Sequence, residues 1–162
     1  MNKTLFALLT LTAFAAPTFG EVVKLPDDSP YASINIPESW KPEKYDDGVE
    51  CLSPDKGVYI AVEGFTGDNV KSSVEEAIKY LKKKGVTVNA ASQKQKDFKL
   101  GELDAGEIIW DGKDEGGECI VSLTFVEITP KKGLMLIYWA SPESEKKYQS
   151  VLGKIALSIK AL

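Results

Sequence analysis

The chain has 162 residues, a formal net charge of −4 and no histidine, and all 20 of its basic residues are lysines. Without histidine it lacks the commonest general base and metal ligand, which excludes serine or cysteine nucleophiles activated by histidine. Without arginine, and with an acidic net charge, nucleic-acid binding is not expected. Two cysteines are too few for a structural zinc site. We therefore expect no metal and no other cofactor.

The first 20 residues have the pattern of a cleavable export signal. Lys3 precedes the apolar run 5–16, which is too short to cross a bilayer, since that takes about 20 apolar residues. Small residues at 18 and 20 favour a cut after Gly20, and an A-x-A site at residues 13–15 offers an earlier one. A buried N-terminal helix is the alternative, but this run has no polar face. We expect a periplasmic or secreted protein with no membrane anchor after cleavage.

Removal of residues 1–20 leaves 142 residues, and the loss of Lys3 shifts the net charge to −5. This length is typical of a single domain, which we place at residues 21–162. Residues 21–30 hold two prolines and suggest an extended arm. Alternating apolar residues then predict three strands, at residues 31–36, 48–52 and 58–63.

One amphipathic helix is predicted over residues 72–84. Ser72 and Ser73 can each cap it, because each is followed three residues later by a glutamate. One face of this helix is apolar, at Val74, Ala77, Ile78 and Leu81. A run of lysines occupies the last turn, and Gly85 is expected to end the helix.

The second half of the chain predicts further strands, a loop and a closing helix. The strands are expected at residues 86–98, 105–110, 119–129 and 134–140, with a loop at 111–117. The last strand is apolar on both faces, which is typical of a central strand. Ser141 and Pro142 begin a helix that extends to residue 159. The predicted fold class is α+β, an antiparallel sheet of about six to seven strands with helices packed on it.

The segment Ile34-Asn35-Ile36-Pro37-Glu38-Ser39-Trp40, an alternating strand followed by proline and tryptophan, resembles the Mog1/PsbP-like family, which includes small exported bacterial domains of the DcrB type. The predicted helices and long strands fit the same family in order and length over nearly all of residues 21–162. The resemblance implies the family's α+β fold. It also implies a role in binding proteins or larger assemblies, and it carries over no catalytic residues.

Cys51 and Cys119 both lie in the exported part of the chain. An even number of cysteines outside the cytoplasm permits one disulfide. Both also lie within apolar strand patterns, so two buried free thiols are the alternative.

Trp40 and Tyr45 are the candidate binding edge. They lie between two predicted strands, beside a proline and two lysines. Exposed aromatic residues in loops often anchor partners. The alternative is a loop tryptophan that folds onto the core.

The segment 111–118 carries four carboxylates in eight residues, which raises the question of calcium. Lys113 occupies the third position, where an EF-hand loop has an aspartate or asparagine. We therefore favour a solvated turn.

The leading functional hypothesis is an exported, non-enzymatic binding or accessory module for an unknown protein or envelope component. One alternative is a hydrolase that uses carboxylates alone, for example among Asp46, Asp47 and Glu63. The other is a small carrier of an apolar ligand.

Overall fold

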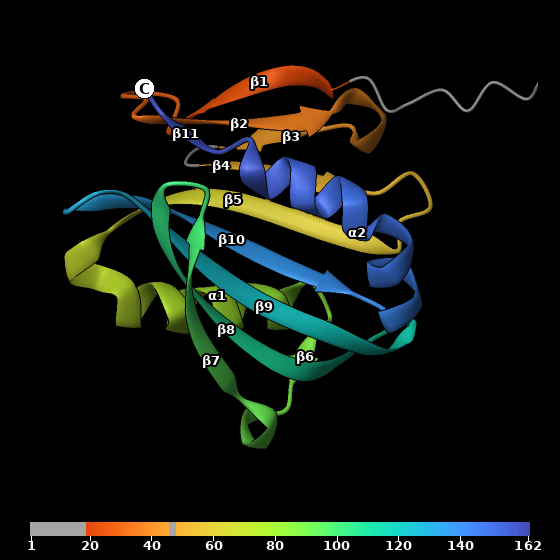
Figure 1. Cartoon of the computed structure of the whole chain (residues 1–162). Helices are drawn as coiled ribbons and strands as arrows, with labels where there is room; N and C mark the ends of the chain where they lie inside the picture. Colours follow the sequence, from red (N-terminus) through yellow and green to blue (C-terminus); the bar gives the residue numbers. More distant parts are fainter. Residues whose placement is uncertain (1–18, 46–47) are drawn as a thin grey trace, which may run out of the picture.

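A computed structural model describes residues 19–45 and 48–162 (Figure 1). The predicted export signal lies outside the described residues except for its last two positions. The described chain forms two antiparallel sheets and two α-helices, which confirms the predicted α+β class. No helix in this part of the chain is long and apolar enough to span a membrane.

The larger sheet has eight strands in the order β3-β4-β5-β10-β9-β8-β6, with β7 paired to β8. Their bounds are β3 Glu43–Tyr45, β4 Gly48–Leu52, β5 Val58–Thr66, β6 Thr87–Val88, β7 Lys94–Leu100, β8 Leu103–Asp114, β9 Gly117–Thr129 and β10 Lys132–Ala140. Strand β10 lies between β5 and β9, and Leu134 to Ile137 are buried on both faces. The central position predicted from its apolar sequence is confirmed.

A second sheet has three strands in the order β1-β2-β11, with bounds β1 Phe19–Leu25, β2 Ala32–Pro37 and β11 Lys160–Ala161. The expected arm at residues 21–30 is thus in part a paired strand. Val23 and Leu25 are buried in the core, and their burial holds β1 against β2. Strands β1, β3 and β11, and the division of the predicted strand 86–98 into β6 and β7, raise the strand number above the six to seven expected.

Helix α1 spans Val70–Lys83 and begins two residues before its predicted start. The hydroxyls of Ser72 and Ser73 donate to the carbonyl of Asn69, so neither serine caps the helix. Gly85 has a φ of 84° and follows the helix end, as predicted.

Helix α2 spans Pro142–Leu157 and ends two residues before its predicted end. Ser141 caps it as predicted, because its hydroxyl oxygen accepts a hydrogen bond from the Ser144 amide at 3.2 Å. Three short 3-10 helices, Glu38–Trp40, Gly67–Asn69 and Ala90–Ser92, complete the described elements.

The predicted loop at residues 111–117 is wrong. Strands β8 and β9 extend through it, and the ladder continues to the pair Asp114 and Gly117. Polar side chains do not stop a strand there because most of them lie on exposed positions near the hairpin end. The predicted strand at 86–98 is also divided, with a 3-10 turn between β6 and β7.

The two faces of the larger sheet carry separate apolar clusters. Helix α1 covers one face, whereas α2 and the three-stranded sheet cover the other (Figure 1). On this second face a groove remains between α2 and strands β7, β8 and β9, so that part of the face is only partly covered. This uneven cover positions the candidate site.

Candidate functional site

Trp40 is not part of an exposed edge. Its side chain is 2% exposed, and its ring meets the ring of Tyr148 edge-on with centroids 5.5 Å apart. The alternative, a loop tryptophan folded onto the core, is therefore correct. The sequence alone could not decide between an exposed and a buried Trp40, because a tryptophan beside proline and lysine is compatible with both.

Tyr45 is half-buried, and its hydroxyl donates to Glu63 Oε1 at 2.7 Å. Burial and the neighbouring Glu63 carboxylate raise the pKa of Tyr45 well above its usual range. The side chain of Tyr45 is thus held in place by Glu63 of β5. Asp46 and Asp47, the other carboxylates considered for hydrolysis, lie outside the described residues.

Cys51 and Cys119 are free, buried and far apart, which corrects the candidate disulfide. They belong to the clusters on opposite faces of the larger sheet. Their strands β4 and β9 are separated by β5 and β10, three strand spacings or about 14 Å. A disulfide needs Cα atoms within about 7 Å. The structure therefore does not bring the two thiols together.

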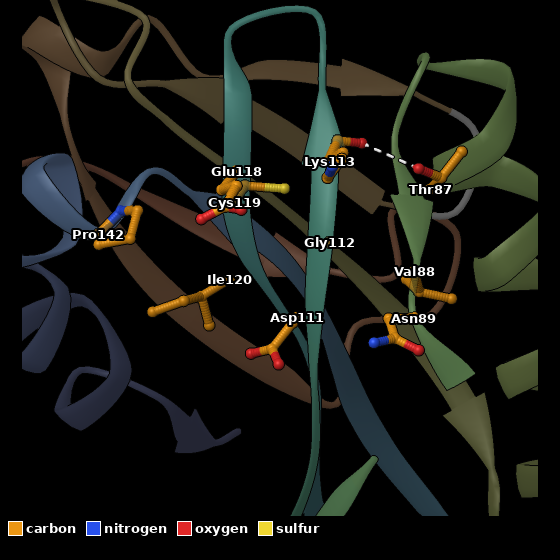
Figure 2. Close-up of a pocket in the computed structure, with 10 residues that line it drawn as sticks. All are labelled: Thr87, Val88, Asn89, Asp111, Gly112, Lys113, Glu118, Cys119, Ile120 and Pro142. Atoms are coloured by element: carbon orange, nitrogen blue, oxygen red, sulfur yellow. Dashed lines mark hydrogen bonds between the residues drawn. The ribbon is translucent and has the colours of Figure 1, made fainter. Parts of the chain in front are cut away.

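The carboxylates of segment 111–118 lie along a hairpin, next to a hollow of about 530 Å³. Figure 2 shows the labelled side chains spread over β6, the two hairpin strands and Pro142, without converging on one point. A hydrogen bond from the Thr87 hydroxyl to the Lys113 carbonyl, 3.3 Å long, joins β6 to the hairpin. Within the described residues, no group of three acidic or cysteine side chains is placed to hold a metal ion.

A polar cluster around Glu50 was not foreseen from the sequence. The carboxylate of Glu50 accepts hydrogen bonds from Tyr59, from Tyr80 at 2.7 Å and from Lys84 at 2.9 Å. Burial acts to raise the pKa of this carboxyl, but these hydrogen bonds outweigh it and lower the pKa to about 2. All three groups that donate to Glu50 belong to this chain, on β5, on α1 and directly after α1. The cluster therefore joins β4, β5 and α1, and we assign it to stability.

The strongest candidate site is a groove of about 310 Å³ between α2 and strands β7 to β10. We call it the α2 groove. Most of its surface is apolar, formed by Ile60, Phe98, Leu100, Ile109, Ile120, Leu136, Leu152, Ile155 and Ala156. Gly153 of α2 also lines it, and a Cβ built on this glycine meets no atom within 4 Å. The missing side chain leaves room at the helix side of the groove.

Tyr138 brings an unpartnered polar atom into this apolar surrounding. Its hydroxyl is buried and has no hydrogen-bond partner among the described residues. A buried, unpaired hydroxyl costs on the order of 1–3 kcal/mol, so such groups are rare in folded proteins. Burial raises the pKa of Tyr138 well above its usual range, and the charges of Glu145 and Glu107 raise it further. The hydroxyl is therefore protonated, and its hydrogen has no acceptor among the described residues.

The groove has a charged rim. Lys96 Nζ lies 2.6 Å from Glu107 Oε2, so these two charges largely offset each other. Glu145, near the start of α2, adds a second carboxylate that has no ion-pair partner among the described residues. The site thus combines an apolar interior, one free donor and a net negative rim.

Sequence reasoning missed the α2 groove, although two of its features are visible in the sequence. Gly153 interrupts the apolar face of the last helix, and Tyr138 carries a hydroxyl near the end of an otherwise apolar strand. A glycine in a helix and a tyrosine in an apolar strand are each common by chance, so neither feature alone indicates a site. Only the packing of α2 on β10 places the two residues in one groove.

No protein-family model and no curated protein matches the sequence. Solved structures do resemble the fold. One is a protein of Bacteroides thetaiotaomicron, with 16% identity, a TM-score of 0.59 and coverage of 90% of this chain. This chain spans only 49% of that protein.

Two further structures match over most of both chains. LpqN of Mycobacterium tuberculosis has 16% identity and a TM-score of 0.51, and covers 87% of this chain and 90% of its own. Cyanobacterial PsbP from Synechocystis has 6% identity and a TM-score of 0.57, and covers 94% and 98%. At these identities the likeness establishes the fold alone. It confirms the fold implied by the sequence resemblance.

Proposed function

We propose that this protein, which has the Mog1/PsbP-like α+β fold, is an exported, non-enzymatic binding module that receives the apolar part of an envelope component in the α2 groove. The observation that carries the proposal is the Tyr138 hydroxyl, unpartnered within a mostly apolar groove. Ligand sites combine apolar walls with a few polar groups that fix orientation, and this groove has both. The groove is not an enclosed cavity, which suits a binding module better than a carrier that encloses its ligand.

Two observations support export. The first 20 residues have the pattern of an export signal, and a cut after Gly20 preserves the buried part of β1, Val23 and Leu25. LpqN, which shares the fold, is described as involved in cell envelope biogenesis. The intact mass of the protein recovered outside the cytoplasm tests this proposal. A chain that begins at Glu21 is expected, a cut near Ala15 would revise the site, and an uncut chain would overturn the proposal of export.

The hydrolase alternative has less support. The α2 groove does contain two carboxylates, Glu107 and Glu145. However, Glu107 is held by Lys96, whereas a pair of catalytic carboxylates needs one general acid and one free base or nucleophile.

Binding of a neutral fluorescent probe, N-phenyl-1-naphthylamine, tests the groove. We expect the purified protein to bind the probe with enhanced fluorescence, and Gly153→Leu to reduce that binding at least tenfold. The leucine fills the open space at Gly153 and also favours the helix, so the variant should fold.

Glu76→Leu is the matched control, because it adds the same side chain to an exposed position of the other helix. It should bind the probe like the unmodified protein. Absence of probe binding to the unmodified protein, or equal binding by Gly153→Leu, would overturn the proposed site.

A further inference from the structure

We infer that the natural occupant of the α2 groove is a single acyl chain whose polar end is an uncharged ester or amide, and that the groove discriminates against free fatty acids. The inference rests on the function proposed above and adds the chemical class of the ligand. It draws on the size of the groove, the free donor and the distribution of charge around that donor.

The size of the groove favours one chain. Its volume of about 310 Å³ lies at the lower end of the range for ligand pockets, which is roughly 300–1,000 Å³. Its apolar lining extends from Phe98 and Leu100 on β7 to Ile155 on α2. An apolar lining of this kind in a small groove matches a flexible methylene chain, in which each buried CH₂ contributes about 0.8 kcal/mol.

The free donor determines what the polar end must offer. The Tyr138 hydroxyl has no acceptor among the described residues, and its surroundings keep it protonated. A ligand that brings a carbonyl oxygen to this hydroxyl would remove the cost of the unpaired donor. Ester and amide carbonyls supply such an acceptor without a charge.

The rim excludes a charged acceptor. Glu145, which has no ion-pair partner among the described residues, acts on the Tyr138 hydroxyl more strongly than Glu107 does, so the potential at the hydroxyl is negative. Among the described residues that line the groove, Lys96 is the only cation, and it is already paired with Glu107 at 2.6 Å. A fatty-acid carboxylate at this position would be repelled and would find no free counter-charge. Hydroxyl groups of an uncharged head, by contrast, can donate to the same two carboxylates.

Competition against the bound N-phenyl-1-naphthylamine tests the inference. The competitors are 1-decanoylglycerol and decanoate, which share one acyl chain and differ at the polar end, each used below its aggregation concentration at pH 7.5. We expect 1-decanoylglycerol to displace the probe at a concentration at least tenfold lower than decanoate.

Two variants assign the preference to residues. Tyr138→Phe should weaken 1-decanoylglycerol about five- to tenfold and leave probe affinity unchanged. Glu145→Gln should strengthen decanoate about threefold or more and change 1-decanoylglycerol little. Glu143→Gln, an exposed position two residues earlier in the same helix, is the control and should change neither.

The outcomes separate the inference from the proposed function. If the probe binds but the two amphiphiles compete equally, or if neither competes, the inference is overturned and the groove remains a binding site. If the probe does not bind at all, the proposed function is overturned as well. Unchanged selectivity in Glu145→Gln and Tyr138→Phe would also contradict the inference.

Discussion

Tyr138 and Trp139 are neighbours in β10 that point to opposite faces of the larger sheet. Tyr138 lines the α2 groove, whereas Trp139 stacks on Tyr59 with ring centroids 3.9 Å apart, on the side covered by α1. Adjacent residues of a strand alternate between the two faces of a sheet in this way. The two faces therefore have separate roles, one with the candidate site and one with the Glu50 cluster.

Replacement of Glu50 by glutamine is expected to destabilise the protein in a pH-dependent way. The pKa of Glu50 is lowered to about 2 in the folded protein, below its value in the unfolded chain. Its stabilising contribution is thus complete above about pH 4.5 and is lost as the pH falls towards 2. At pH 7 we expect the free energy of unfolding to fall by about 1–2 kcal/mol, after allowance for solvent screening of this partly exposed group.

Urea unfolding at pH 7 and pH 3 measures this effect. The difference between Glu50→Gln and the unmodified protein should shrink at the lower pH. Glu76→Gln, an exposed position of α1, serves as the control and should cost little at either pH. A constant difference at both pH values would contradict the assignment.

The two thiols are expected to be free and unreactive in the folded protein. Burial and the nearby Glu50 carboxylate raise the pKa of Cys51 to about 12, and burial and Asp114 raise that of Cys119 to about 11. Treatment with 5,5′-dithiobis(2-nitrobenzoate) without reductant should label neither cysteine in buffer and both in urea. A requirement for reductant before labelling in urea would show that a disulfide exists.

Much of the fold was predictable because its signals are local. The strand Gly48–Leu52 was placed at its observed bounds, and the cap at Ser141 and the end of α1 at Gly85 follow from single residue types. Strand β1 was missed because its partner β2 is joined to it across two prolines, and pairing is a tertiary property that no local pattern encodes.

The candidate site was not predictable for a similar reason. The sequence left Trp40 open between a binding edge and a residue folded onto the core, because its ring packs against Tyr148, which lies more than a hundred positions away in the sequence. The α2 groove likewise combines β5, β7, β8, β9, β10 and α2, and its floor is made of residues that look like ordinary core. What marks it is an unpaired hydroxyl, which only the structure reveals.

Loss of the cap at Ser141 should destabilise α2 and thereby the α2 groove. The hydroxyl oxygen of Ser141 accepts a hydrogen bond from the Ser144 amide, which would otherwise be unpaired at the helix start. We expect Ser141→Ala to lower the free energy of unfolding by about 0.5–2 kcal/mol, measured by urea titration. Ser150→Ala, exposed within the same helix, is the matched control and should be neutral or slightly stabilising. Equal effects of the two changes would contradict the role of the cap.

Two glycines should respond oppositely to alanine because their surroundings differ. At Gly133 a Cβ would meet the backbone oxygen of Val126 and the ring of Phe65, and the backbone atom cannot move aside without disturbing the ladder of β9 and β10. Gly133→Ala should therefore lower the free energy of unfolding by about 1–3 kcal/mol. At Gly153 a Cβ meets nothing within 4 Å and the backbone is helical. Gly153→Ala should therefore raise the free energy of unfolding by about 0.5–1 kcal/mol. Urea unfolding of both variants gives the sign of each change in the free energy of unfolding. A loss of stability in Gly153→Ala would mean that the groove beside α2 is more tightly packed than the structure indicates.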